Sequence, residues 1–528
     1  MSDDKLNLSI NGTDIQVDKG TTILEAARTL GVEIPTFCQH DGLSKPANCR
    51  MCLVNTNKAP KLLPACYATC MDGMEVQTED ERTLKARKAT LEFILVHHPV
   101  DCPICDQAGE CVLQDNYFNH SAQPSRIFTQ KNAKPKATPL GPHVMLDAER
   151  CIVCTRCVRF CDEISKTSEL QVVSRGSRSF VTTFPGIELD NKYSMCAADV
   201  CPVGALTTKD FRFKMRVWFL KSANSVCSGC SRGCNIEIDH GQGEVQRYRP
   251  RLNMDVNQWW MCDEGRLSYK EYQEDRITQA SISGQSVSSK EAIASVAEQL
   301  KGVSDMSKVA VVPSLLSTNE DLFALSQWAT TVGAGTWYLG GRAAGEKDEL
   351  LIQADKNPNR KGLDDVMASA HVSSANLSAL GAAIDSGAVT GVVWMGHEHQ
   401  VDAELLSKLS GLSFSVVFAS NATHATSFSS NVIPIRSFEE VDGTWSNFEG
   451  RVQRLHQAVD PRKSLLPLWK ALYRLARAMD LQDQLPIPFS ARRLFEQMAA
   501  EIKAFEGASF NSESSTGTTE KNPTEAAA

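Results

Sequence analysis

The sequence lacks several features that define common protein classes. It has no run of 18 or more apolar residues, and its N-terminus, Met1-Ser2-Asp3-Asp4, has neither the basic nor the apolar segment of a signal peptide. We therefore expect a protein that stays inside the cell and contacts a membrane only through a partner. Acidic residues outnumber basic ones, and the formal net charge of −8 makes nucleic acid an unfavourable partner. No nucleophile–base pair, P-loop or dinucleotide-binding fingerprint is visible, so we expect no substrate-converting catalytic site in this chain.

Cysteine is absent from the second half of the chain, because all 18 cysteines lie at or before Cys262. Disulfides are disfavoured in a reducing compartment, and a chain of 528 residues can build its core without them. Thiolates at close spacing instead require a metal that neutralises and holds them. The sequence therefore predicts metal centres in the first half and another role for the second.

The first cysteine set has the spacing C-x10-C-x2-C-x13-C. An alternating segment, residues 6–17, precedes it with Asn11-Gly12 as its hairpin turn, followed by a helix that a Thr22/Glu25 capping box opens. This order is typical of a small ferredoxin-like module. Four thiolates fit a 2Fe-2S cluster, with zinc as the alternative. The set is Cys38, Cys49, Cys52 and Cys66.

The second set mixes one imidazole with three thiolates. Pro99, Pro103 and Gly109 prevent a continuous helix, as a ligand loop requires. Spacing alone leaves a 4Fe-4S cluster and a structural zinc ion equally open. A neutral histidine ligand removes one negative charge, so for a cluster we expect a higher midpoint potential than four thiolates would give. The set is His98, Cys102, Cys105 and Cys111.

The third set begins with the bacterial ferredoxin run C-x2-C-x2-C-x3-C, which starts at Cys151. Cys161 and Cys196 alone cannot complete a second cluster, so one 4Fe-4S cluster is the simplest interpretation. The cysteines assigned to it are Cys151, Cys154, Cys157 and Cys201.

The fourth set lies in a loop rich in glycine and serine, followed by a β-rich stretch at residues 235–251. A further 4Fe-4S site fits its four cysteines, which are Cys227, Cys230, Cys234 and Cys262. Cys70, Cys161 and Cys196 are left without an assigned role.

Five strings carry a family resemblance: PTFCQHDGLSKPANCRMCLV, HHPVDCPICDQAGECVLQDN, ERCIVCTRCVRFC, CPVGALTTKD and CSGCSRGCNIEI. Their order and spacing resemble the large iron–sulfur subunit of NADH-quinone oxidoreductase, which is bacterial respiratory complex I. Two departures, Ala47 for a frequent Gly and His97 for a frequent Asn, affect no ligand position.

The resemblance implies a 2Fe-2S cluster on the first set and a 4Fe-4S cluster on each of the other three. The fourth set is similar to an extra site that only some family members have, away from the main electron route. Electrons would pass from the NADH/FMN-binding subunit toward quinone, coupled to proton translocation. The implied partners are that subunit, a thioredoxin-like 2Fe-2S subunit and a ferredoxin-like 4Fe-4S connecting subunit. The implied location is the peripheral arm on the cytoplasmic side of the bacterial inner membrane.

Beyond Cys262, predicted helices alternate with continuous apolar strands, which indicates a parallel, doubly wound α/β sheet. We expect helices at 288–300, 319–331 and 403–409, and strands at 309–312, 389–395 and 414–419. The string EVDGTWSNFEGRVQ resembles molybdopterin oxidoreductases. Because no cysteine remains to ligate molybdenum, we expect a truncated domain of this type without molybdopterin, although a serine ligand stays possible.

The predicted fold is thus α+β ferredoxin-like iron–sulfur modules followed by an α/β molybdopterin-oxidoreductase-like domain. Two other functions stay open: the cluster-bearing subunit of an NAD-linked formate dehydrogenase or hydrogenase, and a zinc-stabilised scaffold. The expected domains are 1–88 (2Fe-2S, β-grasp), 89–135 (4Fe-4S with one histidine and three cysteine ligands), 136–218 (4Fe-4S ferredoxin-like), 219–275 (4Fe-4S of molybdopterin-oxidoreductase type), 276–506 (truncated α/β) and 507–528 (disordered tail).

Overall fold

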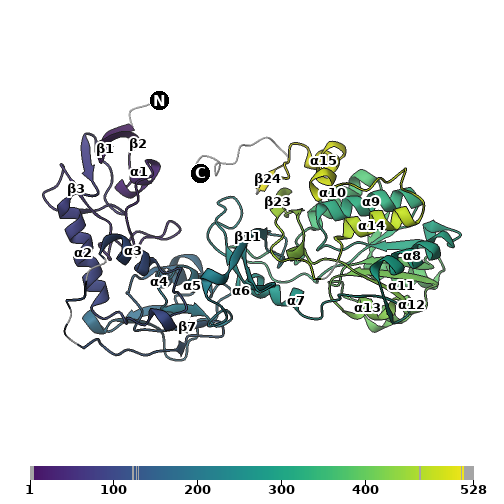
Figure 1. Cartoon of the computed structure of the whole chain (residues 1–528), viewed down its shortest axis with the longest axis horizontal. Coiled ribbons are helices and arrows are strands. Elements are labelled where there is room, and N and C mark those ends of the chain that lie inside the picture. The colour runs from purple at the N-terminus through teal and green to yellow at the C-terminus, as the bar shows by residue number, and fades with distance from the viewer. Residues whose placement is uncertain are drawn as a thin grey trace. The chain divides into compact units, whose positions relative to one another are not determined.

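The computed structural model of the chain describes residues 5–121, 124–126, 128, 130–462, 465–512 and 514–516. It divides into two compact units, Met1–Leu220 and Lys221–Ala528 (Figure 1). In the described part of the chain, no helix has both the length and the apolar composition needed to cross a membrane.

The first unit begins with a five-stranded sheet in the order β2-β1-β5-β3-β4. The predicted hairpin is confirmed, because β1 and β2 pair antiparallel around Asn11-Gly12, both at positive φ. The Thr22/Glu25 capping box also forms and opens α1, which buries one face in the core of this sheet. The bounds are β1 (Lys5–Ile10), β2 (Thr13–Asp18), α1 (Ile23–Thr29), β3 (Leu53–Thr56), β4 (Leu63–Pro64) and β5 (Met74–Gln77).

Short elements make up the rest of the first unit. Three strands form a sheet in the order β10-β7-β6, and β8 and β9 form a separate antiparallel pair. The elements are α2 (Glu81–Leu95), η1 (Cys102–Ile104), α3 (Val112–His120), β6 (Thr138–Pro139), β7 (Val144–Leu146), α4 (Arg156–Arg159), the π-helical turn η2 (Phe160–Ile164), β8 (Leu170–Val173), η3 (Gly176–Arg178), β9 (Phe180–Thr183), α5 (Cys196–Asp199), β10 (Leu206–Thr208) and η4 (Val217–Phe219).

The second unit opens with a three-stranded antiparallel sheet, which confirms the β-rich stretch expected after Cys234. Two short helices follow it. The bounds are β11 (Lys221–Val226), β12 (Asn235–Gly241), β13 (Glu244–Pro250), α6 (Asp263–Leu267) and α7 (Tyr269–Gln273).

An eight-stranded sheet forms the centre of the second unit, in the order β15-β14-β21-β20-β19-β16-β17-β18. Its six strands from β16 to β21 are parallel, and the chain proceeds outward from β16 and β19 in opposite directions, so the doubly wound prediction is confirmed. The strands are β14 (Ala280–Ile282), β15 (Gln285–Val287), β16 (Val309–Val312), β17 (Trp337–Leu339), β18 (Ser374–Asn376), β19 (Gly391–Met395), β20 (Phe414–Ala419) and β21 (Asn431–Pro434).

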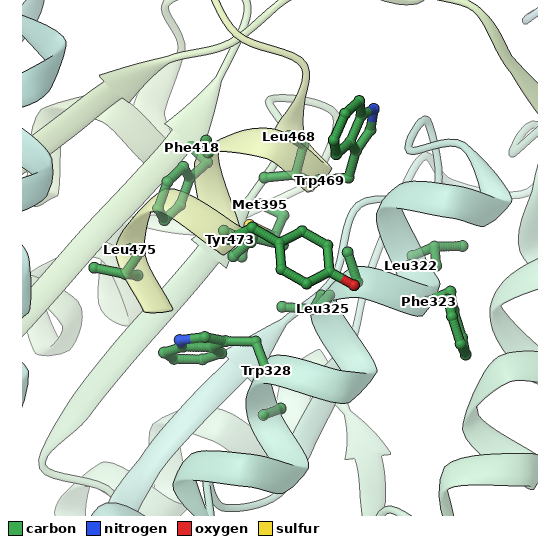
Figure 2. Close-up of a cluster of buried hydrophobic side chains, with 14 of the residues drawn as sticks. Leu322, Phe323, Leu325, Trp328, Met395, Phe418, Leu468, Trp469, Tyr473 and Leu475 are labelled. Carbon is green, nitrogen blue, oxygen red and sulfur yellow. The ribbon is translucent and has the colours of Figure 1, made fainter. Parts of the chain in front are cut away.

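Helices cover both faces of this sheet, and alternate strand residues enter two separate cores. Val393 and Met395 belong to the core with α8, α9, α14 and α15, whereas Val392 and Trp394 belong to the core with α11 to α13. Figure 2 shows the first core, where Trp328 of α9 and Tyr473 of α14 lie near Met395 and Phe418. The remaining elements are α8 (Ser289–Lys301), η5 (Met306–Lys308), α9 (Asn319–Val332), α10 (Arg360–Ala370), η6 (Leu377–Ala379), α11 (Leu380–Asp385), α12 (Ala403–Ser410), α13 (His424–Phe428), η7 (Phe438–Glu440), β22 (Gly443–Ser446), β23 (Arg451–Leu455), α14 (Leu468–Ala478), α15 (Ala491–Glu501), η8 (Lys503–Phe505) and β24 (Ser514–Thr516).

The structure differs from the expected tail, residues 507–528, over its first part. Phe510 is buried against Phe495 of α15, and residues 514–516 pair with β23. An aromatic side chain at the end of a polar stretch therefore extends the core beyond Glu506. Residues 513 and 517–528 lie outside the described part of the chain.

Candidate metal centres

The first cysteine set comes from two loops: Cys38, Cys49 and Cys52 lie between α1 and β3, and Cys66 lies between β4 and β5. Hydrogen bonds from the Cys49 and Cys66 thiols lower the pKa of Cys38, and the same bonds raise the pKa of the two donors. The Cys66 thiol also donates to the sulfur of Cys52, which lowers the pKa of Cys52. The four thiols thus form one connected group, and such a group can act as the thiolate donors of a metal centre.

The second set lines a cavity of about 550 Å³ in the first unit. Burial lowers the pKa of His98 to about 4, so this imidazole is neutral at physiological pH. Its buried Nδ1 has no hydrogen-bond partner among the described residues, which leaves a lone pair available for a metal. His98, Cys102, Cys105 and Cys111 all face this cavity.

A glycine opposite the second set provides space. A Cβ atom on Gly204 would overlap Cys105 Sγ, so only glycine fits here without displacing the sulfur. Burial raises the pKa of Cys105, and that of Cys111 to about 11, which disfavours the bare thiolates. A bound metal would reverse this preference, because it stabilises the thiolate form directly.

The third set lines a narrow cavity among apolar side chains such as Ile152 and Val181. The cavity-lining cysteines are Cys151, Cys154, Cys157 and Cys201. The backbone N–H of Val153 donates to Cys151 Sγ over 3.4 Å. Val153 and Thr155 both have positive φ, an unfavourable conformation for residues with side chains, and this lets the loop wrap around the cavity. Burial raises the pKa of Cys151 to about 11 and that of Cys154 to about 12.

The fourth set lies in the second unit between β11, β12 and α6. Two backbone N–H groups point at its sulfurs: that of Gly229 donates to Cys227 Sγ and that of Gly265 to Cys262 Sγ, each over 3.3 Å. A Cβ on Gly265 would lie 2.8 Å from Cys227 Sγ. Lys356, far along the chain, also lines this cavity with Leu351 and Ile352. The donors that share it are Cys227, Cys230, Cys234 and Cys262.

These observations fit iron–sulfur clusters at all four sets. Each set supplies four sulfur or imidazole donors, glycines leave room beside two of them, and backbone N–H groups point at sulfurs as they do around such clusters. Over the described ranges, no three His, Cys, Asp or Glu side chains are grouped as one bound metal ion would require.

Three cysteines lie outside the four sets. Cys70 is part of the apolar core beneath the first sheet, and burial raises its pKa to about 11. Cys161 and Cys196 are fully buried, in η2 and at the start of α5. The spacing of the cysteines along the chain assigns no role to these three. The sequence also does not indicate that Gly204 and Lys356 lie at metal sites, because each meets its cysteines only through a contact between residues far apart in the chain.

Family comparisons agree with the four sets. Four consecutive segments match described families: residues 3–81 a 2Fe-2S iron-sulfur cluster binding domain, 87–126 the NADH-ubiquinone oxidoreductase-G iron-sulfur binding region, 141–207 the ferredoxin-like domain of NADH-quinone oxidoreductase subunit 3, and 220–270 the NDSU1/NuoG-like 4Fe-4S domain of NADH-ubiquinone oxidoreductase. The chain is therefore an iron–sulfur protein with one 2Fe-2S domain and several 4Fe-4S domains.

Individual relatives narrow this class. The chain is 36% identical over 367 residues to the mitochondrial iron-sulfur protein 1 of NADH dehydrogenase from Solanum tuberosum, covering 69% of this chain and 50% of the relative. It is 37% identical over 336 residues to a subunit of the NADH-quinone oxidoreductase from Rickettsia bellii, covering 63% and 49%. The chain belongs to this family of large iron–sulfur subunits, and it spans about half the length of these relatives.

Two solved structures are more distant. An NAD+-reducing [NiFe]-hydrogenase chain is 28% identical with a TM-score of 0.37, and the match covers 40% of this chain and 91% of that chain. Acetylene hydratase from Pelobacter acetylenicus is 9% identical with a TM-score of 0.44, over 56% of this chain and 74% of that chain.

Proposed function

We propose that this chain is an electron-transfer subunit of an NADH:quinone oxidoreductase. It would carry one 2Fe-2S cluster on the first cysteine set and a 4Fe-4S cluster on each of the other three. Iron–sulfur clusters accept and release one electron at a time. The observation that carries the proposal is the gathering of each complete donor set into one group or cavity, inside a segment that matches an iron–sulfur family.

The chain's own residues would hold and tune these centres. Apolar neighbours such as Ile152 and Val203 exclude water from the third set, and backbone N–H groups supply hydrogen bonds to sulfur. Both features influence a cluster's potential. Neutral His98 replaces a thiolate at the second set and makes that site less negative.

We infer the wider assembly from the family resemblance. Electrons would enter from an NADH/FMN-binding subunit and leave toward quinone, coupled to proton translocation. A thioredoxin-like 2Fe-2S subunit and a ferredoxin-like 4Fe-4S connecting subunit would be further partners. The complex would lie at the cytoplasmic side of the bacterial inner membrane, with this chain in its peripheral arm. We further propose the first five domains given above, with the α/β domain extended to include β24. We also propose that this α/β domain is of molybdopterin-oxidoreductase type and binds no molybdenum cofactor.

The test is metal and acid-labile sulfide analysis of the anaerobically purified chain, with low-temperature EPR after reduction by dithionite. We expect about 14 iron atoms per chain, both 2Fe-2S and 4Fe-4S signals and no molybdenum. Zinc without sulfide would support the scaffold instead. Iron together with molybdenum or tungsten would instead support a formate dehydrogenase subunit, whose metal cofactor would lie in the α/β domain.

A further inference from the structure

Two arginines of α4 connect the third cysteine set to the loop of the first set, within the first unit. Arg159 Nη2 donates to the backbone oxygen of Cys38 over 2.5 Å, and its Nη1 donates to that of Ser44. Arg156 Nη2 donates to the backbone oxygen of Gln39, and its Nη1 to that of Val200 over 3.5 Å. The two guanidinium groups thus reach residues at or next to Cys38 of the first set and Cys201 of the third.

Further hydrogen bonds connect the ligand loop of the first set to the segment that carries the third set. Ser44 donates to Glu163 of η2 through its backbone N over 2.8 Å and through its Oγ over 2.5 Å. Asn48 Nδ2 donates to the backbone oxygen of Val153 over 3.5 Å. The ligand loop of the first set is therefore bound along its length to the segment that carries the third set.

The two guanidinium groups are buried at this contact. Arg159 is only 9% exposed, and Arg156 is largely buried. Among the residues that the structure describes, neither guanidinium forms an ion pair with a carboxylate. Burial lowers the pKa of Arg156, and the groups that oppose this effect and favour its charged form are Cys154 and Cys201 of the third set and Cys38 of the first. Buried cations need a compensating negative charge, and here the two cysteine sets are placed to supply it.

We propose that Arg156 and Arg159 are positioning residues that clamp the first and third centres together and raise the midpoint potentials of both. The inference rests on the proposed function, because it requires clusters at these sets. A nearby positive charge stabilises the reduced, more negative state of a cluster, and weak solvent screening in the interior strengthens this effect.

The test uses the full chain, purified anaerobically, in an EPR-monitored redox titration. In Arg159→Met, the oxidised-to-reduced ratio of the first and third centres at a fixed ambient potential rises on the order of tenfold, which is about 59 mV for one electron. The second and fourth centres keep their potentials. Arg159→Lys retains the positive charge, so both midpoint potentials should return most of the way to the wild-type values. The control is Arg82→Met, which removes an exposed arginine that donates to the backbone oxygen of Pro60.

Each outcome decides the proposal. Unchanged potentials of the first and third centres in Arg159→Met and Arg156→Met, with the iron content intact, would overturn it. If the variants lose iron, loss confined to the first and third centres supports the clamp, whereas equal loss from all four overturns it. Failure of the proposed function looks different, because the wild-type chain itself would then lack sulfide and iron.

Discussion

Glycines beside the cysteine sets control how much space each site offers. Gly204 faces Cys105, and Gly265 faces Cys227, each at a distance that a methyl group would fill. The sequence alone could not single them out, since each glycine meets its sulfur only after folding.

Gly204→Ala should selectively remove the 4Fe-4S cluster that we propose for the second set. The added Cβ would overlap Cys105 Sγ, so either the sulfur moves or the backbone is strained, at a cost of roughly 1–3 kcal/mol. We expect the iron content to fall by about four atoms while the other EPR signals persist. Gly381→Ala is the control, because its nearest neighbour would be 3.5 Å away. A full iron complement in Gly204→Ala would contradict this account of the site.

His98→Cys should lower the midpoint potential of the second centre. Burial lowers the pKa of His98 to about 4, so its imidazole is neutral and contributes no negative charge. A thiolate in its place adds one, and we expect a decrease on the order of 100 mV in a redox titration. An unchanged midpoint, with the cluster still assembled, would exclude a tuning role for the histidine.

At the scale of elements, the sequence predicts helices and turns from local patterns well, but it predicts contacts between residues far apart in the chain poorly. Two pairs in the sequence, Ser317/Glu320 and Thr318/Asp321, fit the capping pattern before α9, and the local pattern does not distinguish between them. The structure caps α9 with Thr318 and Asp321. Glu320 instead accepts hydrogen bonds from the backbone N and Oγ1 of Thr444, 124 residues away, so tertiary contact decided between two equivalent local patterns.

The same distinction between local patterns and distant contacts applies to the metal sites. Donor spacing along the chain predicted the groups that the structure brings together at Cys38, His98, Cys151 and Cys227. Most donors of each set are close together along the chain, so sequence spacing limits which thiols can meet, although Cys201 and Cys262 are more distant. Arg159 of α4 donates hydrogen bonds to carbonyl groups more than 100 residues away, and no local sequence pattern indicates such a contact.

The buried first turn of α9 should make stability depend on pH. Burial raises the pKa of Glu320 to about 7, although bonds from its own backbone and Thr444 partly oppose this. Between its unfolded value near 4.5 and about 7, the folded state therefore binds more protons than the unfolded state, and stability falls as pH rises through this window.

Glu320→Gln should remove that dependence. We expect its thermal unfolding temperature to drop less than that of the wild type between pH 5 and pH 8, by an amount equivalent to on the order of 3 kcal/mol. Glu298→Gln, at an exposed carboxylate of α8, is the control and should follow the wild type. Parallel pH profiles for Glu320→Gln and the wild type would show that the carboxyl does not titrate in this window.

At the scale of the whole molecule, the chain consists of two units that each contain their own apolar cores. The cores around Leu8 and Phe37 lie within the first unit, and those around Trp328 and Trp394 lie within the second. The cysteine sets divide in the same way: three belong to the first unit, and the fourth belongs to the second together with the α/β sheet. The fourth centre should therefore depend for its assembly on the second unit alone.

A chain that starts at Lys221 tests this dependence. All four donors of the fourth set and the distant residue Lys356 that lines their cavity lie in the second unit, so the fragment keeps the complete site. We expect it to fold, to bind about four iron atoms with equal sulfide and to give one 4Fe-4S signal. The matched control carries Cys230→Ser, which should keep the far-ultraviolet circular dichroism spectrum but lose the signal. A folded fragment that binds no iron would mean that the fourth site requires the first unit, because the donors alone would then be insufficient.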